Sequence, residues 1–215
     1  SNCGNAVLDA GEQCDDGNDF IADGCSNTCQ VEGGWQCSDP TPSGNIGDPG
    51  FEAGTPNPEW TEGSTNPIGT PICQVSVCGR GGGTGPSEGS FWAWFGGVPN
   101  ATEEGSLSQA VVIPTSVSEL RFDLEIPACD SAADYLEVLI DGNREWVING
   151  SSARCGDDGY ASQAVDISDY ADGGSHDLEF HSETFASEGG VSNFFVDVVT
   201  LPGTQPCVFS SAAAT

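Results

Sequence analysis

SNFFVDVVTL, Ser192 to Leu201, is the stretch that decides the fold. Its β-branched and aromatic residues predict a buried β-strand, and a carboxylate, Asp197, lies at its centre. An ionised group packed against a core costs roughly several kcal/mol unless a cation or several donors meet it. The best partner is Glu52 in DPGFEAG, residues 48–54, at the other end of the same domain. Two hard carboxylates suit Ca²⁺, so we expect Glu52 and Asp197 to share a calcium ion that joins the first strand to the last.

Working outward from this stretch, turn signals recur between strand-like runs, which is the pattern of an all-β sandwich. The expected strands are 50–53, 72–77, 90–96, 106–113, 117–126, 134–140, 144–149, 162–167, 176–182 and 191–201. The clearest hairpin is YLEVLIDGNREWVI, 135–148, with Asp141-Gly142 as its tight turn. LSQAVVI (107–113) and LRFDLEI (120–126) predict another pair of alternating strands.

The GFE opening at Glu52, the later Trp60 and the closing FFVDVV together resemble the jelly-roll type of carbohydrate-binding module. MAM-like and bacterial adhesin-type jelly rolls are similar. The resemblance covers about residues 48–203. It implies a β jelly roll in which the Glu of the first strand and the Asp of the last hold a structural calcium ion, with carbohydrate as the ligand.

The first unit, 3–37, contains five cysteines in the spacing C-x10-C-x10-C-x3-C-x7-C, with the acidic strings CDDGN and ADGC between them. A unit this short buries too little apolar surface to fold on its core alone, so disulfides and a metal must contribute. The expected oxygen ligands for calcium are Asp15, Asp16, Asn18 and Asp23. The alternative is a solvated turn held by Asx hydrogen bonds.

The strings GEQCDDGN and DGCS and the closing GWQC of this unit resemble the myxobacterial-type cysteine-rich repeat, which is similar in style to the calcium-binding Lin-12/Notch repeats. The sequence departs from that pattern in one respect, because a sixth cysteine expected shortly after Cys37 is missing. The chain then divides into a cysteine-rich repeat (1–38), a linker (39–49), a β jelly-roll domain (50–203) and a C-terminal tail (204–215).

The ten cysteines predict disulfides and an oxidising compartment, and therefore a secreted or cell-surface protein. They are Cys3, Cys14, Cys25, Cys29, Cys37, Cys73, Cys78, Cys129, Cys155 and Cys207. Because the sequence begins Ser-Asn without Met and shows no signal peptide, we expect a mature or excised piece of a larger secreted protein. The chain has no CxxC pair of the kind that holds zinc. Five cysteines precede the linker and five follow it, so if all are paired an odd number of bridges must cross it. We expect Cys37–Cys207 to cross it, and Cys73–Cys78 and Cys129–Cys155 to close local loops, although sequence alone does not fix connectivity.

The chain contains 4 basic and 33 acidic residues, for a formal net charge of −29. Nucleic acid and anionic membrane surfaces are therefore poor partners for this chain, since both require positive charge, and we expect neither nucleic-acid binding nor membrane insertion. No apolar run is long enough to insert into a membrane. The acidity fits a calcium-rich or saline exterior, where cations screen the self-repulsion, or it only confers solubility.

Aromatic side chains are the usual platform for sugar rings, and FWAWF, 91–95, is the densest cluster. In a strand, Trp92 and Trp94 share one face and the two phenylalanines share the other, so one of these faces must be core. Trp92, Trp94 and Trp146 are the candidate ligand-binding residues, each with a purely structural role as the alternative.

The sequence contains no recognised catalytic motif. His176 and His181 lie five residues apart on one predicted strand and so point to opposite faces. We therefore expect a non-catalytic extracellular module that recognises carbohydrate on a surface or polymer, stabilised by Ca²⁺ and disulfides. The alternative is a structural or adhesive module that contacts a surface protein or further copies of itself in an array or filament.

Overall fold

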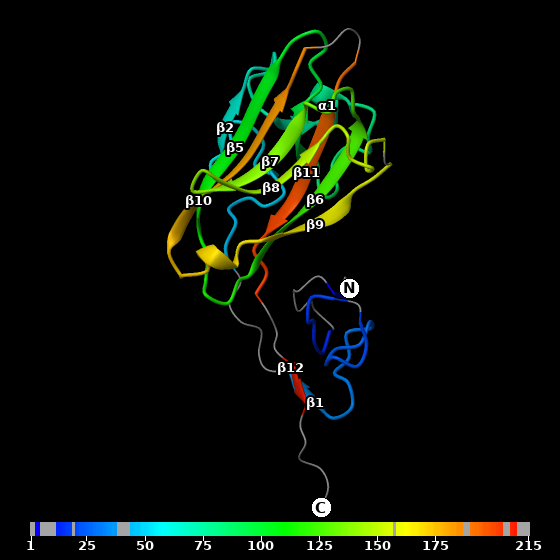
Figure 1. Cartoon of the computed structure of the whole chain (residues 1–215), viewed down its shortest axis with the longest axis vertical. Coiled ribbons are helices and arrows are strands. Elements are labelled where there is room, and N and C mark those ends of the chain that lie inside the picture. Colours follow the sequence, from blue (N-terminus) through cyan, green and yellow to red (C-terminus); the bar gives the residue numbers. More distant parts are fainter. Residues whose placement is uncertain are drawn as a thin grey trace, which may run out of the picture.

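The computed structural model describes residues 3–4, 12–18, 20–37, 44–156, 158–186, 190–203 and 207–209. Two five-stranded antiparallel sheets, ordered β2-β5-β10-β7-β8 and β3-β4-β11-β6-β9, lie face to face (Figure 1). The strands are β1 (Trp35–Cys37), β2 (Thr61–Ser64), β3 (Ile72–Gln74), β4 (Phe91–Gly96), β5 (Glu103–Val112), β6 (Glu119–Ala128), β7 (Tyr135–Ile140), β8 (Asn143–Asn149), β9 (Ala161–Asp166), β10 (Ser175–Thr184), β11 (Asn193–Thr200) and β12 (Cys207–Phe209). Two short helical turns, α1 (Val75–Cys78) and η1 (Ser168–Tyr170), connect them. The predicted all-β sandwich is confirmed.

The alternation of side chains along the strands builds one core between the two sheets. Along β6, Leu120, Phe122 and Leu124 point inward from one sheet. Phe180 meets them from the other sheet, with its ring edge-on to Phe122 at a centroid distance of 5.1 Å. The predicted hairpin is β7–β8, and Asp141 and Gly142 take the positive φ angles, 52° and 77°, that its tight turn requires.

The predicted strand at 50–53 is wrong, because these residues form turns. Phe51 is fully buried but has a φ of 60°, so it enters the core from a turn. Residues 75–77 form a helical turn after β3 and do not extend the strand. β2 was not predicted, because TEGS contains no large apolar residue. β5 and β6 exist as predicted, but they lie in different sheets and do not pair with each other.

Five disulfides account for all ten cysteines. The predicted bridges Cys37–Cys207, Cys73–Cys78 and Cys129–Cys155 are confirmed. Within the first unit, Cys3 pairs with Cys29 and Cys14 with Cys25. β1 pairs with β12 in a separate two-stranded sheet that sets Cys37 opposite Cys207, so the first unit is tied to the chain just beyond the last strand of the sandwich.

The first unit also contacts the sandwich through Arg121 of β6. Its guanidinium donates to the carbonyl oxygens of Gly17 at 3.1 Å and Gly4 at 3.4 Å, and its Nε donates to Glu119 at 2.5 Å. This unit, in blue, lies at the lower end of Figure 1, and α1 lies near the upper end. In the described part of the chain, no helix has the length and apolar character to cross a membrane.

Candidate ligand-binding face and metal sites

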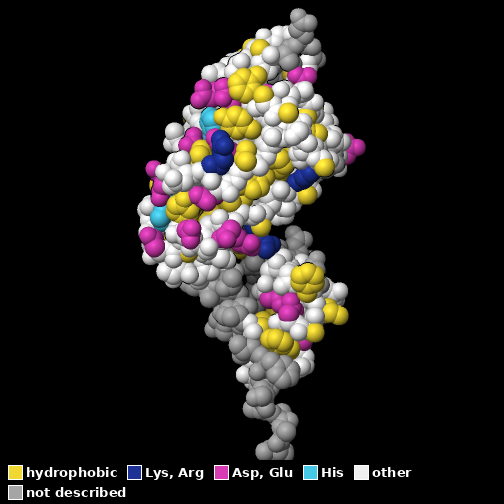
Figure 2. All heavy atoms as spheres, in the orientation of Figure 1, with side chains coloured by type: hydrophobic (Ala, Val, Ile, Leu, Met, Phe, Trp, Pro, Cys, Tyr) yellow, Lys and Arg dark blue, Asp and Glu magenta, His cyan; other side chains and the backbone are white. Residues whose placement is uncertain are grey.

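The outer face of sheet β2-β5-β10-β7-β8 carries polar side chains in ordered rows. Residues that lie directly opposite on neighbouring strands project to the same side of a sheet. One row is Glu104, Glu183, Tyr135 and Asn149, and the next is Ser106, His181, Glu137 and Val147. Figure 2 shows histidine, basic and acidic side chains beside one another on the visible face of the sandwich. We call the outer face of the β2-β5-β10-β7-β8 sheet, with these two rows at its centre, the β7–β10 face.

Glu137 organises the β7–β10 face. Its side chain is only 6% exposed, and it pairs with Arg144 of β8 through Oε2 and with His181 of β10 through Oε1, the latter at 2.9 Å. Arg144 is 54% exposed, so it is anchored at its Nε while much of its surface remains in solvent. Because the buried Glu137 carboxylate bonds to both Arg144 and His181, it fixes the positions of these two side chains before a ligand binds.

Tyr135 supplies the aromatic surface of the β7–β10 face. Arg144 lies 5.8 Å from its ring centroid and the His181 ring lies at 5.9 Å. Its hydroxyl donates to Glu183 Oε2 at 3.3 Å. Burial, together with the charges of Glu137 and Glu183, raises the pKa of Tyr135, so the phenol stays protonated and remains a donor at neutral pH.

The outer face of the other sheet is covered by residues 79–90, a glycine-rich segment. Beneath it, Trp92 and Phe195 are fully buried and pack together at a centroid distance of 5.8 Å. Trp94 is partly exposed and donates from Nε1 to Asn193 at 3.0 Å. The predicted division of FWAWF into a core face and an outer face is confirmed, because Phe95 packs in the main core while both tryptophans lie on the other side of β4. Trp92 offers no surface to a ligand in this arrangement.

Carboxylates hold the covering segment in place. Glu125, fully buried, accepts hydrogen bonds from the amide and hydroxyl of Thr84 at 3.0 and 2.7 Å. Asp123 accepts from the Ser87 hydroxyl at 2.7 Å. Asp197 accepts from the Ser87 amide at 2.8 Å. Backbone amides and side-chain hydroxyls of the segment therefore attach it to carboxylates of β6 and β11.

Glu52 and Asp197 both approach Gly50, and a calcium ion shared between them remains a prediction. Both lie beside Gly50, where an added Cβ would be 3.6 Å from Asp197 Oδ1 and 3.8 Å from Glu52 Cγ. Glu52 Oε1 accepts from the amides of Ser90 and Phe91 at 2.8 and 2.9 Å. Asp197 Oδ1 and the Glu52 side chain approach the same side-chain-free position, and both residues supply carboxylate oxygens, the ligands that Ca²⁺ prefers.

Burial raises the pKa of Asp197 to about 7, against the lowering effect of the amides of Glu88, Val198 and Ser87. A carboxyl whose folded pKa exceeds its unfolded value stabilises the fold more as it becomes protonated. In chelator, we therefore expect the melting temperature of the wild-type chain to rise relative to Asp197→Asn as the pH falls from about 8 to about 5. Differential scanning calorimetry measures this, and a difference between the two chains that does not change with pH would contradict it.

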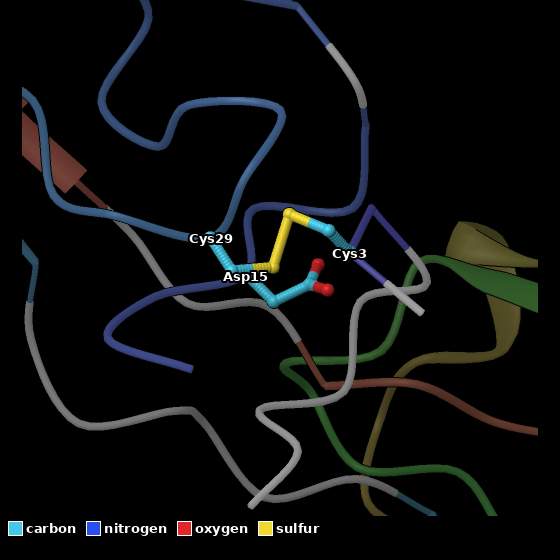
Figure 3. Close-up of side chains that lie close together, drawn as sticks. All are labelled: Cys3, Asp15 and Cys29. Carbon is cyan, nitrogen blue, oxygen red and sulfur yellow. A yellow bond between two sulfur atoms is a disulfide. The ribbon is translucent and has the colours of Figure 1, made fainter. Parts of the chain in front are cut away.

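In the first unit, Asp15 lies beside the Cys3–Cys29 disulfide (Figure 3). Among the described residues these three form the only group of at least three potential metal ligands. The two cysteines are bonded to each other, so they are not available to a metal. Asp15 accepts from the amides of Gly4 at 2.8 Å and Gly17 at 2.9 Å, which gives its carboxylate a structural task in the loop.

Asp16 and Asp23 fit a cation better. Each has a buried Oδ1 atom that accepts no hydrogen bond from the described residues. Burial, followed by the charge of Asp23, raises the pKa of Asp16. Two like charges with unmet oxygens are the arrangement that a bound Ca²⁺ would neutralise. Asn18, the other expected ligand, accepts from the Phe20 amide at 2.7 Å in the Asx turn that was the alternative interpretation.

Trp146 is partly buried against the core and packs edge-on to Phe122 at 5.2 Å. The residues that sequence reasoning missed, Tyr135, Glu137 and His181, lie on the opposite, outer face of the same sheet, because Trp146 pairs with the inward-facing Val138. The available signal was the alternation in YLEVLI, which places Tyr135 and Glu137 on the side of β7 opposite Leu136 and Val138.

No protein-family model and no curated protein matches the chain. A carbohydrate-binding module solved in complex with β-1,4-galactotriose aligns over 72% of this chain and 95% of its own, with 17% identity and a TM-score of 0.48. The Stig cyclase Fisc from Fischerella sp. TAU aligns over 74% and 95%, with 14% identity and a TM-score of 0.45. A family 11 carbohydrate-binding module from Clostridium thermocellum, in complex with a β-1,3-1,4-mixed-linked tetrasaccharide, aligns over 76% and 98%, with 11% identity and a TM-score of 0.42. These likenesses concern the β-sandwich alone, and the chain is an all-β sandwich joined to a disulfide-rich N-terminal unit.

Proposed function

We propose that the chain is a non-catalytic extracellular module that binds a neutral polysaccharide on the β7–β10 face and is stabilised by Ca²⁺. The observation that carries the proposal is the fixed set of Tyr135, Arg144 and His181 around the buried Glu137. Sugar rings stack on aromatic faces, and their hydroxyls both donate and accept hydrogen bonds. A side-chain set held in place before binding loses little entropy when the ligand arrives.

The charge of the chain restricts the ligand. With a net charge of −29, the protein repels anionic polymers such as uronic-acid polysaccharides at moderate ionic strength. Glu104 and Glu183, directly opposite each other on the β7–β10 face, add local repulsion. A neutral polymer meets no such barrier, and hydrogen bonds to carboxylates are strong ones.

Calcium in this proposal is structural. Glu52 and Asp197 would hold one ion next to Gly50, and Asp16 and Asp23 would hold another in the first unit. Both positions lie outside the β7–β10 face. Bound Ca²⁺ would supply positive charge to buried or crowded carboxylates, and the ligand would bind elsewhere.

A polysaccharide and glycan array in millimolar calcium tests the function, followed by titration calorimetry on any neutral glycan that binds. We expect Tyr135→Ala to weaken binding at least about tenfold, because it removes the stacking surface at the centre of the site. Tyr170→Ala is the matched control. That tyrosine lies off the face, where it contacts Glu145 and His176, and its loss should leave the affinity unchanged.

Two outcomes would contradict this assignment. If Trp94→Ala abolished binding while Tyr135→Ala did not, the ligand would bind on the opposite sheet. If no glycan bound the folded, calcium-loaded protein, carbohydrate recognition itself would be wrong.

A further inference from the structure

The acidic residues are unevenly distributed. Between Glu62 and Glu103, 63–102 contains a single acidic residue, Glu88, and a single basic one, Arg80. The net charge of this segment is therefore zero in a chain whose total is −29. The exposed residues of this segment around α1 add no net charge of their own, which lowers the repulsion that another acidic protein meets there.

This neutral region contains an apolar hollow of about 190 Å³ beside α1. Trp94, Ile68, Val77 and the Cys73–Cys78 disulfide line it, and no acidic residue does. Val77 is 63% exposed and Ile68 49%, so apolar surface extends from the hollow onto its rim. An adjacent hollow is lined by Val75 and by Arg80, again without an acidic residue. Exposed apolar surface of this kind marks an interaction site.

A complementary feature lies on the first unit. Phe20 and Ile21 are 75% and 66% exposed, more than any other large hydrophobic residue that the structure describes. In the sequence they are flanked by Asp19 and Asp23. They belong to the unit at the lower end of Figure 1, far from α1, so they cannot fill the hollow of their own chain.

We propose that Phe20 and Ile21 of one copy insert into the hollow beside Trp94 of a second copy. The apolar side chains would cover Ile68 and Val77, which line the hollow and its rim. The two surfaces are different patches of the same chain, so the contact is heterologous and adds molecules head to tail instead of closing a two-fold dimer. This inference goes beyond the proposed glycan binding and does not depend on it, because neither surface includes the β7–β10 face.

Sedimentation velocity of the full chain over a wide range of concentration tests the proposal. An ionic strength of about 0.15 M is suitable, because the Debye length is then about 8 Å and the long-range repulsion between copies is screened. We expect reversible association beyond the dimer. Phe20→Ser, in the inserted segment, and Val77→Glu, in the hollow, should each weaken it at least about tenfold. Val112→Glu, at a valine that is 52% exposed on β5, is the control and should associate like the wild type.

Mixing the two defective variants separates head-to-tail contact from a symmetric one. Phe20→Ser keeps an intact hollow and Val77→Glu keeps an intact inserted segment, so the mixture should form heterodimers that do not grow further. The three substituted side chains, those of Phe20, Val77 and Val112, are exposed, and circular dichroism verifies that each variant is folded. A wild-type chain that stays monomeric at every concentration, or a Phe20→Ser chain that associates like the wild type, would overturn the proposal.

Discussion

Chelation of calcium is expected to lower the melting temperature of the wild-type chain by about 5 to 15 °C, and Asp197→Ala is expected to remove most of that response. Asp197 is fully buried, and no side-chain cation among the described residues pairs with it. Its raised pKa of about 7 means that the ionised form costs on the order of 4 kcal/mol in the metal-free fold. A Ca²⁺ ion shared with Glu52 would cancel that cost, and its binding free energy would add to the stability of the fold.

Calorimetric scans of wild type, Asp197→Ala and a matched control measure this response with and without chelator. Asp166→Ala is the control, because that aspartate is exposed and bonds only locally to Ser168. It should respond to chelator like the wild type. The double variant Asp16→Asn/Asp23→Asn removes the pair in the first unit and should lose only part of the response.

The outcomes assign calcium to one site, both or neither. A full response in Asp197→Ala that disappears in the Asp16→Asn/Asp23→Asn variant would place the ion in the first unit and contradict the site at Gly50. An identical melting curve with and without chelator in the wild type would contradict both sites.

The strands were predictable where one face of the strand is apolar. Leu120, Phe122 and Leu124 alternate with polar residues, so their period alone identifies β6. β2 was not predictable in this way, because TEGS contributes backbone hydrogen bonds to β5 and no large side chain to the core. At Phe51 the error is the reverse, because a strand is predicted where the structure has a turn. The burial of Phe51 depends on a left-handed backbone conformation in that turn, which composition does not encode.

The candidate site was less predictable than the fold. The pairing of β10 with both β5 and β7 brings Glu137 and His181 together, although they are 44 residues apart in sequence. Local patterning identifies which side chains leave the core but not which strands become neighbours. The tryptophans were the predicted ligand-binding residues, but the structure packs Trp92 and Trp146 against other side chains.

Removal of the Cys37–Cys207 bridge, in Cys37→Ser/Cys207→Ser, is expected to be the most damaging loss of any disulfide. The two cysteines are 170 residues apart, and the chain-entropy model gives about 5 kcal/mol for a loop of that length. For a chain of this size that corresponds to a fall in melting temperature of about 10 to 20 °C. The loop encloses the whole sandwich, so the bridge restricts the unfolded chain far more than any local staple does.

Cys73→Ser/Cys78→Ser is the matched control, because that bridge spans only 5 residues and the same model gives about 2 kcal/mol. Calorimetry of the two double variants compares them directly, and limited proteolysis reports whether the first unit is released. Equal losses of stability in both would show that Cys37–Cys207 holds only the small β1–β12 sheet and not the sandwich. A larger loss in Cys37→Ser/Cys207→Ser, together with faster cleavage in the linker at 39–49, would show instead that the bridge and the Arg121 contacts with Gly4 and Gly17 hold the two units as one body.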